Sequence, residues 1–294
     1  MLEKYKDVFS SPGKNIGKTH LVEFVVRTIP GAQPVKHRVR PLNPIMRESL
    51  RKQIQEWKEE GIIEETSSPW AAAMVPCAKK DGGIRWAVDY RPLNTVTIVD
   101  TYPLPSIEEN LQKLAGSCIF STLDATSAHN TIQVEKKSQP MLAFVSCFGQ
   151  FQFKRMPFGP VNSGATYSRF IDTMVEKLRT PYILAYVDDT IVHNPSLEQH
   201  LVSLEKAIGA HMECGIKLKA SKTILFEPIV NYLGYEVSEA RVSMRKDYVE
   251  KILELPVPKT SKELRSLLGF MSYYRDRKST RLNSSHLVIS YAVF

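Results

Sequence analysis

The stretch ILAYVDDTIVHN, residues 183–194, places two adjacent aspartates between two apolar half-strands. Because ILAYV precedes Asp188-Asp189 and TIV follows it, the pattern predicts a hairpin with both carboxylates at its tip. Adjacent like charges repel each other unless a cation or strong hydrogen-bond donors neutralise them. Aspartate is also a common turn residue, so the pair alone leaves open a plain turn and a metal site.

A second buried-strand pattern, CIFSTLDA at residues 118–125, ends near another carboxylate, Asp124. If the two strands are neighbours, three carboxylates meet at adjacent strand ends. Such an oxygen-only set could hold two Mg²⁺ ions, which keep water and substrate phosphates as their other ligands. Two such ions activate a hydroxyl and stabilise a leaving pyrophosphate in an in-line displacement. The third aspartate therefore favours the metal site.

Helix and strand signals alternate irregularly along the rest of the chain. A helical stripe of apolar residues covers residues 164–179. Capping boxes, in which Ser or Thr precedes Glu or Gln by three residues, predict helices that begin after Ser106, Ser196 and Thr260. Two apolar strands flank a basic, glycine-containing turn at residues 79–83. This mixture predicts an α+β fold with helices packed on one face of an antiparallel sheet.

The composition of the 294 residues narrows the class of protein. An apolar fraction of 43% is too high for a disordered chain, and no apolar run approaches the roughly 18 residues of a membrane span. The N-terminus lacks the apolar segment of a secretory signal, so we expect a cytoplasmic protein without membrane association. The excess of 39 Lys and Arg over 31 Asp and Glu suits a polyanionic partner without identifying one.

The four cysteines are far apart in the sequence and show no CxxC spacing, so they do not indicate a zinc site or a disulfide framework. We expect reduced residues of an ordinary core, which implies no oxidising compartment. They are Cys77, Cys118, Cys147 and Cys214.

Five phrases of the sequence resemble the motif set of a reverse transcriptase. They are VDYRPLN at 88–94, YPLP at 102–105, LDA at 123–125, MPFG at 156–159 and YVDD at 186–189. Each phrase alone is weak, but their order and spacing fit the family from about His20 to Tyr274. The DYRPLN, YPLP and MPFG phrases resemble the gypsy class of long-terminal-repeat retrotransposons rather than the copia class or the non-LTR elements.

The resemblance implies a right-hand polymerase with an antiparallel-sheet palm, fingers and a partial helical thumb. The expected parts are an N-terminal extension or linker at 1–29, fingers at 30–99 and 132–154, a catalytic palm at 100–131 and 155–240, and a partial thumb at 241–275. The last segment, 276–294, resembles a translated sequencing-library adapter, and we expect it not to be native. RNase H and integrase regions are implied elsewhere in a parent polyprotein, and a virus-like particle is an alternative location.

The same resemblance implies that Asp124, Asp188 and Asp189 are the catalytic metal ligands, with the backbone carbonyl of Ala125 as a further ligand. The implied cofactor is a pair of Mg²⁺ ions, with Mn²⁺ as an alternative. The residues implied to hold the triphosphate of the incoming nucleotide are Lys79, Lys80, Arg85 and Lys222. Without the family, the same basic residues are equally typical of a solvated turn and of plain surface charge.

The residues implied to contact the primer are Tyr186, Leu233, Gly234 and Tyr235. From the pattern alone they are typical of ordinary strand packing around a glycine. One position departs from the family, which usually has Gly-Tyr where this chain has Ala128-His129. The aromatic ring at that position forms a floor under the nucleotide sugar. We therefore expect His129 at the nucleotide site and altered discrimination against ribonucleotides.

The implied reaction is RNA-directed DNA synthesis, in which dNTPs are added to the 3′-hydroxyl of a primer on an RNA or DNA template. Two alternatives stay open. An RNA-dependent RNA polymerase also uses aspartate pairs, and its preference for ribonucleotides would separate it. A degenerate remnant that binds nucleic acid without catalysis is the other alternative, and the three intact aspartates argue against it. The sequence does not indicate the oligomeric state.

Overall fold

The computed structural model describes residues 2–10, 16–78, 82–103, 106–253 and 257–275. Lys79, Lys80 and the terminal segment 276–294 therefore lie outside the described residues. The chain divides into two compact units, Met1–Val242 and Ser243–Phe294. In the described ranges, no helix combines the length and the apolar character needed to cross a bilayer.

A four-stranded sheet of order β11-β5-β10-β9 carries the aspartates. Its strands are β5 (Ile119–Asp124), β9 (Ile183–Tyr186), β10 (Asp189–Asn194) and β11 (Ile224–Glu227). Every neighbouring pair of strands is antiparallel. The hairpin expected within residues 183–194 is confirmed, and the strand that ends on Asp124 is its direct neighbour.

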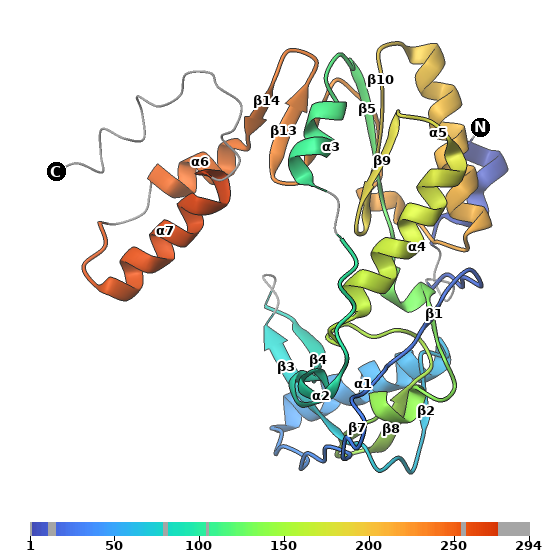
Figure 1. Ribbon diagram of the computed structural model, residues 1–294, viewed down its shortest axis with the longest axis vertical. Helices are drawn as coiled ribbons and strands as arrows, with labels where there is room; N and C mark the ends of the chain where they lie inside the picture. Colours follow the sequence, from blue (N-terminus) through green and yellow to red (C-terminus); the bar gives the residue numbers. More distant parts are fainter. Residues whose placement is uncertain (1, 11–15, 79–81, 104–105, 254–256, 276–294) are drawn as a thin grey trace. The chain divides into compact units, whose positions relative to one another are not determined.

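Both faces of this sheet are covered, because successive apolar side chains of a strand alternate between two clusters. Val192 packs with Leu204 on one face, whereas Ile191 packs with Leu114 on the other. The covering elements are α3 (Ile107–Lys113), α4 (Ser163–Leu178), α5 (Leu197–Glu213), β12 (Ile229–Tyr232) and β13 (Tyr235–Ser238) (Figure 1). The expectation of helices on only one face is wrong, because α3 and the β12–β13 hairpin bury the second apolar face.

The first residues of the chain belong to the same unit. The short helix η1 (Leu2–Val8) buries Tyr5 and Val8 in the cluster that contains α5. The Tyr5 hydroxyl and the Lys4 ammonium both donate to the carboxylate of Glu205, at 3.2 and 3.0 Å. The segment expected as a linker or extension thus contributes to the core.

A five-stranded sheet of order β2-β8-β7-β3-β4 forms the second sheet of this unit. Its strands are β2 (Ile63–Glu65), β3 (Ala72–Ala78), β4 (Ile84–Asp89), β7 (Phe144–Ser146) and β8 (Gly149–Phe153). The pair β3–β7 is parallel and the other pairs are antiparallel. The two apolar strands expected around residues 79–83 are confirmed as β3 and β4.

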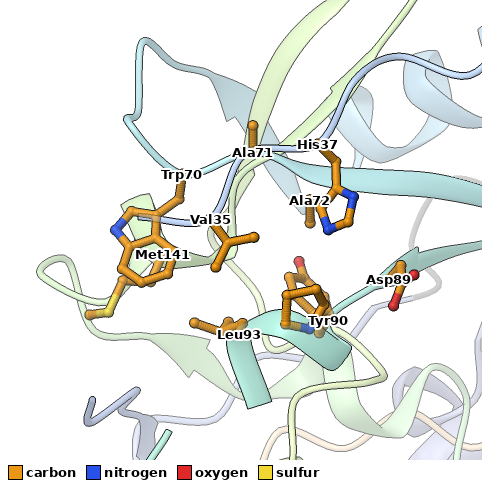
Figure 2. Close-up of a pocket in the computed structure, with 10 residues that line it drawn as sticks. Val35, His37, Trp70, Ala71, Ala72, Asp89, Tyr90, Leu93 and Met141 are labelled. Atoms are coloured by element: carbon orange, nitrogen blue, oxygen red, sulfur yellow. The ribbon is translucent and has the colours of Figure 1, made fainter. Parts of the chain in front are cut away.

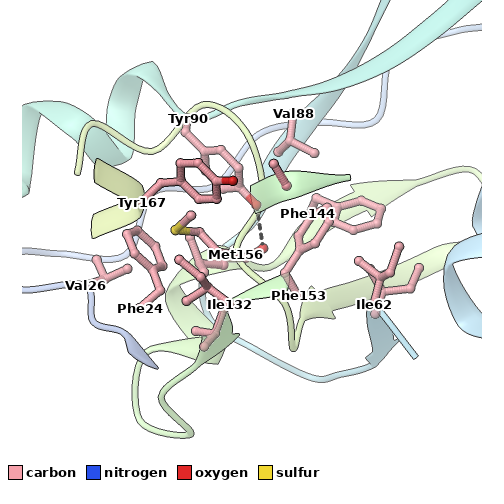
Figure 3. Packing of buried hydrophobic residues seen from close by; sticks show 14 of the residues in the cluster. Phe24, Val26, Ile62, Val88, Tyr90, Ile132, Phe144, Phe153, Met156 and Tyr167 are labelled. Atoms are coloured by element: carbon pink, nitrogen blue, oxygen red, sulfur yellow. Dashed lines mark hydrogen bonds between the residues drawn. The ribbon is translucent and has the colours of Figure 1, made fainter. Parts of the chain in front are cut away.

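The largest hydrophobic cluster lies between this sheet and the helices α1 (Pro44–Glu59), α2 (Arg91–Val96) and α4 (Figure 3). Trp57 of α1 packs against Phe144 and Phe153, with ring centroids 6.2 and 5.5 Å away. The buried Tyr90 hydroxyl donates to the carbonyl of Leu142 at 2.9 Å, so its polar atom has a partner inside the apolar cluster.

Short segments complete the first unit. They are β1 (Glu23–Phe24), β6 (Gln133–Val134), η2 (Ala128–Thr131), η3 (Gln139–Leu142) and η4 (Ala220–Lys222). Strands β1 and β6 pair in parallel. The strand β14 (Val242–Met244) lies at the boundary between the units, and the second unit contains α6 (Lys246–Leu253) and α7 (Ser261–Arg275).

The expected capping boxes are confirmed. The hydroxyls of Ser106, Ser196 and Thr260 each accept from the backbone N–H three residues later, at 3.2 to 3.4 Å. At the start of α7 the Glu263 carboxylate also accepts from the backbone N–H of Lys259, the residue before the cap, at 2.8 Å. These caps satisfy N–H groups that the first turn of a helix leaves without partners.

The cysteines do not all lie in the core. Cys214 is buried and Cys118 is half-buried, but Cys77 and Cys147 are exposed, and none of the four forms a disulfide. Cys77 lies near the outer end of β3, and Cys147 lies in the turn between β7 and β8. The expectation of a core role is therefore wrong for these two residues, because each lies where its strand leaves the packed sheet.

Candidate active site

The aspartates lie where strands of the four-stranded sheet end together. Asp189 is the first residue of β10, and it is the cross-strand partner of both Tyr186 on β9 and Asp124 on β5. Directly opposed residues of antiparallel strands have Cβ atoms about 4.5–5.5 Å apart and face the same side of the sheet. Asp124 and Asp189 therefore present two carboxylates side by side, although 64 positions of sequence intervene.

The tip of the hairpin is the two-residue turn Val187-Asp188, since Tyr186 and Asp189 already pair. The expectation that both aspartates lie at the tip is wrong for Asp189, which belongs to the strand. Val187 has a φ of +53°, in the left-handed region that a β-branched residue rarely adopts. Such a conformation costs about 1–3 kcal/mol and persists only where its surroundings hold it. Here two paired strands hold the turn and leave Asp188 exposed beside Asp189.

The three carboxylates carry more negative charge than the fold neutralises. Desolvation raises the pKa of Asp189, and the charges of Asp188 and Asp124 raise it further, while Lys222 acts in the opposite direction. The Lys222 ammonium donates to Oδ2 of Asp124 at 2.9 Å. Lys222, expected at the nucleotide triphosphate, thus lies against the carboxylates themselves.

This donor set suits a divalent cation, although its geometry is not that of a finished metal site. In the part of the chain that the structure describes, no group of three or more His, Cys, Asp and Glu side chains is arranged to hold an ion. The three aspartates are nonetheless the hard oxygen donors that Mg²⁺ prefers. Since a single lysine cannot balance three carboxylates, the residues that would hold such a cation are Asp124, Asp188 and Asp189.

Two of the residues expected at the nucleotide lie close to one aromatic ring. Arg85, exposed on β4, has its guanidinium carbon 5.2 Å from the ring centroid of Phe158. His129, buried in η2, has its ring centroid 4.1 Å from that of Phe158. Burial lowers the pKa of His129, whereas the charge of Asp188 raises it.

The sequence analysis did not predict that two aromatic residues, Phe158 and Tyr167, contact His129. Phe158 lies in the MPFG phrase, which pointed to the family without assigning this side chain a function. Tyr167 belongs to the apolar stripe of α4, and its ring stacks on His129 with centroids 5.1 Å apart and planes 6° from parallel. Burial, and then the charges of Asp188 and Asp189, raise the pKa of Tyr167. No signal in the sequence separates Phe158 from a buried phenylalanine, because its exposure is decided by the fold.

The residues expected at the primer lie together on the face opposite α5. Leu233 and Gly234 form the turn between β12 and β13, and both have positive φ, as a type I′ turn requires. Leu233, Tyr235 and Tyr186 are all partly buried against the same hydrophobic cluster. Strand packing therefore accounts for these contacts, and among these residues Tyr186 is the cross-strand partner of Asp189.

A separate pocket lies at the edge of the five-stranded sheet and contains none of the expected site residues (Figure 2). Trp70 and Met141 lie at one end of the pocket, and His37 and Asp89 lie at the other. Arg91 donates to both carboxylate oxygens of Asp89, at 2.8 and 2.7 Å, and holds the pKa of Asp89 at about 2. Because the acid is already paired, this pocket is chemically distinct from the aspartate cluster.

Comparison with known proteins identifies the family. The family model described as "Reverse transcriptase (RNA-dependent DNA polymerase)" matches residues 77–237, which include all three aspartates. The Pol polyprotein of transposon 297 of Drosophila melanogaster is 30% identical over 94% of this chain and 26% of its own length. The Tf2-3 polyprotein of Schizosaccharomyces pombe is 32% identical over 80% of this chain and 18% of its own length. The chain thus spans about a quarter or less of these relatives.

Solved structures agree in fold. A foamy viral protease-reverse transcriptase in complex with dsDNA has a TM-score of 0.84 at 24% identity, covering 93% of this chain and 57% of that one. A foamy viral protease-reverse transcriptase in complex with an RNA/DNA hybrid has a TM-score of 0.83 at 23% identity. The match covers 93% of this chain and 37% of that one. The expected α+β polymerase fold is confirmed. With the motif order and the matched transposon polyproteins, this shows that the chain belongs to the reverse transcriptase family, among those of retrotransposons.

Proposed function

We propose that this chain is the polymerase portion of a gypsy-class Pol polyprotein and adds dNTPs to a primer 3′-hydroxyl by two-metal phosphoryl transfer. The observation that carries the proposal is the opposition of Asp124 and Asp189 on neighbouring strands, with Asp188 next to them in the turn. A fold seldom brings three carboxylates together unless a ligand requires them, because their mutual repulsion is unfavourable. The reverse transcriptase family depends in general on divalent metal ions, which supply the missing positive charge.

The proposed division of the chain follows the two sheets. The four-stranded sheet and its helices form the palm, at 100–131 and 155–240. The five-stranded sheet with α1 and α2 forms the fingers, at 30–99 and 132–154, and α6 and α7 belong to a partial thumb at 241–275. In this assignment Asp124 and Asp189 lie on paired strands, and Asp188 lies in the tight turn between two paired strands, which suits a site that must hold its geometry.

Asp124, Asp188 and Asp189, with the carbonyl of Ala125, would hold two Mg²⁺ ions, or Mn²⁺ in their place. When bound, these ions activate the attacking hydroxyl and stabilise charge on the transferred phosphoryl group. The chain's own residues do the rest. Arg85, with Lys79 and Lys80 of the same hairpin, attracts the triphosphate, and Tyr186, with the hairpin residues Leu233, Gly234 and Tyr235, supports the primer end.

In this proposal the Lys222 side chain alternates between Asp124 and the triphosphate of the incoming nucleotide. Its ammonium balances Asp124 at 2.9 Å, and its side chain is 57% exposed, so it can turn outward without losing buried contacts. Cations that neutralise Asp124 would release Lys222 toward the triphosphate. The expected role of Lys222 at the nucleotide and its observed ion pair are then two states of one flexible side chain.

The proposed partners are a primer on an RNA or DNA template, and deoxynucleoside triphosphates. Related folds in foamy virus are seen with dsDNA and with an RNA/DNA hybrid, which supports a duplex as the partner of this chain. A polymerase that copies any sequence must bind its duplex through phosphates and shape, so we expect binding that weakens with salt. RNase H and integrase regions belong to the proposed parent polyprotein, which acts in the cytoplasm or in a virus-like particle.

A primer-extension assay tests the proposal. The full chain is incubated with oligo-dT on poly-rA, dTTP and Mg²⁺, beside its Asp188→Asn variant, which keeps the turn but removes one charge. Extension by the unsubstituted chain, and its loss in the variant, is the expected result. Equal activity of the two would refute catalysis by the aspartates. No extension by either would favour the non-catalytic remnant, and efficient use of UTP in place of dTTP would favour an RNA polymerase.

A further inference from the structure

The segment 215–222, which follows α5, lies along the end of β5 that carries Asp124. The backbone N–H of Lys219 donates to the carbonyl of Asp124 at 2.9 Å, and the Lys222 ammonium donates to the carboxylate of the same residue at 2.9 Å. Next to these contacts, Leu218 forms an antiparallel bridge with the residue that follows Asp124. The segment therefore holds Asp124 both by its backbone and by its side chain.

The opposite edge of this segment pairs with the start of the chain. The backbone N–H of Leu218 donates to the carbonyl of Val8 at 2.9 Å. The backbone N–H of Ser10 donates to the carbonyl of Leu218 at 2.8 Å, so that Phe9 and Leu218 form a parallel bridge. The segment is therefore enclosed between the start of the chain and β5.

Residues 2–10, which we call the N-terminal brace, are anchored in the core of the first unit. The helix η1 of the brace lies against α5 (Figure 1). Val8, Leu218 and Leu123 are each at most 1% exposed and belong to one hydrophobic cluster. Because Leu123 immediately precedes Asp124 in β5, the brace, the segment and the strand that carries the aspartate share one packed core.

A second crossing of the N-terminal chain fixes the start of the segment. A Cβ added at Gly17 would overlap the carbonyl oxygen of Gly215, and a Cβ added at Gly215 would overlap the carbonyl oxygen of Lys18. Gly215 also has a φ of +71°, which residues with a side chain rarely adopt. The two backbones touch here without room for side chains, so the segment is held at Gly215 as well as at Leu218.

We propose that the N-terminal brace is a positioning element for Asp124. The brace fixes the segment from one side, and the segment fixes the carbonyl and the carboxylate of Asp124 from the other. The inference rests on the proposed polymerase function, in which Asp124 is a metal ligand. Groups that hold a metal ligand in place lower the metal affinity when they are lost. The brace therefore adds to the metal affinity of the site without touching a metal or a substrate.

Two changes in the brace test the proposal in the full chain. Val8→Ala removes packing in the cluster that contains Leu218, and Ser10→Pro removes the N–H that donates to the carbonyl of Leu218. Each change should raise the Mg²⁺ concentration for half-maximal primer extension roughly threefold to tenfold. The kcat at saturating Mg²⁺ should change less than about twofold, since excess metal compensates for weaker binding.

Each change has a matched control. Ser10→Ala keeps the backbone N–H, and Val134→Ala makes the same truncation at a valine that is 3% exposed in the cluster beside the five-stranded sheet. Both controls should keep the Mg²⁺ requirement of the unsubstituted chain. An equal rise in either control, or an unchanged requirement in both brace variants, would overturn the proposal.

Amide hydrogen exchange gives a readout that needs neither a metal nor an active enzyme. The amides of Lys219 and Thr126 donate within the pairing of the segment with β5 rather than to the brace. Both amides should exchange roughly fivefold faster or more in Val8→Ala and Ser10→Pro, because the segment loses its outer support. In the two controls they should exchange at close to the rates of the unsubstituted chain.

The two readouts separate this proposal from the proposed function. Faster exchange in the brace variants, with no extension by any of the proteins, would overturn polymerase activity and leave the positioning of Asp124 standing. Unchanged exchange at both amides would overturn the positioning of Asp124, whether or not the chain extends a primer.

Discussion

Strand β10 begins at the aspartate cluster and ends in the core. Its first polar residue is exposed, whereas its last is buried. Asp189, at the first residue, is exposed, and Asn194, at the last, is completely buried. We refer to these regions as the open end and the sealed end of β10. Four residues of the same strand lie between them.

Most polar groups at the sealed end find partners within the chain, although Nε2 of His193 has no hydrogen-bond partner among the described residues. Asn194 contacts Nδ1 of His200 at 3.1 Å and donates to Ser203 at 3.1 Å. His200 contacts Ser121 at 2.7 Å, and His193 contacts Ser117 at 2.8 Å. At the open end, three carboxylates share one lysine. This difference agrees with a stabilising function for the sealed end and with the metal ions that we propose for the open end.

The largest expected effect comes from Asp189→Asn, which removes charge at the open end. Primer extension should fall roughly 10²–10³-fold or more, because electrostatic stabilisation of the reacting groups is lost. The free energy of unfolding at pH 7.5 should stay equal or increase, since the repulsion from Asp188 and Asp124 is relieved. Extension and urea unfolding measured together check this. The control is Glu198→Gln, at an exposed carboxylate on α5, which should change neither primer extension nor the free energy of unfolding. A lower free energy of unfolding in Asp189→Asn would contradict the distinction between the two ends of β10.

The corresponding change at the sealed end is Asn194→Ala. It leaves Nδ1 of His200 and the Ser203 hydroxyl without a partner in a buried site, and we expect a loss of about 2–4 kcal/mol in the free energy of unfolding. Urea denaturation at pH 7.5 measures it. Asn231→Ala, at an exposed position of β12, should change stability by less than about 0.5 kcal/mol. Similar losses in the two variants would show that the sealed network does not stabilise the fold.

Acid pH should act on the two ends in opposite directions. Burial lowers the pKa of His193 to about 4 from an ordinary 6.5, so the unfolded chain binds the proton more tightly than the folded one. Stability from this group is present above pH 6.5 and is lost as the pH falls toward 4, by up to roughly 3 kcal/mol. The pKa of Asp189 is raised, so its contribution is largest at low pH and is lost as the pH rises through the folded value.

Urea midpoints measured from pH 4.5 to 7.5 separate these contributions. His193→Gln should flatten the acid loss of stability. Burial also lowers the pKa of His200 and His211, so part of the slope will persist. Asp189→Asn should steepen the slope, because it removes the opposing group. A slope in His193→Gln as steep as in the unsubstituted chain would contradict the assignment.

The smallest expected effect concerns His129, which is buried beside the open end. His129→Tyr restores the aromatic residue usual in the family, and we expect roughly a twofold to tenfold gain in the preference for dATP over ATP. The reason is steric, since a larger ring leaves less room for a 2′-hydroxyl. Single-nucleotide extension with each substrate measures the ratio. Equal ratios for the two proteins would show that the identity of this residue does not set sugar discrimination.

Much of the local structure was predictable because its causes are local. The alternation around Asp188-Asp189 predicted the hairpin, and the capping boxes predicted three helix starts. The predictions that were wrong depended on distant residues. The second covered face of the sheet came from the hairpin at 229–238, and the exposure of Cys77 and Cys147 depended on which strand ends lie outside the packed sheet.

The sequence by itself determined the family, the fold class and the identity of the three aspartates, because motif order and apolar periodicity are properties of neighbouring residues. Only the tertiary structure decided how those residues meet. It paired Asp189 with Asp124, brought the Lys222 ammonium within 2.9 Å of Asp124, a residue 98 positions earlier, and placed the Phe158 ring close to both Arg85 and His129. Strand register and ring stacking are set by packing across the whole unit, so no single stretch of sequence contains them.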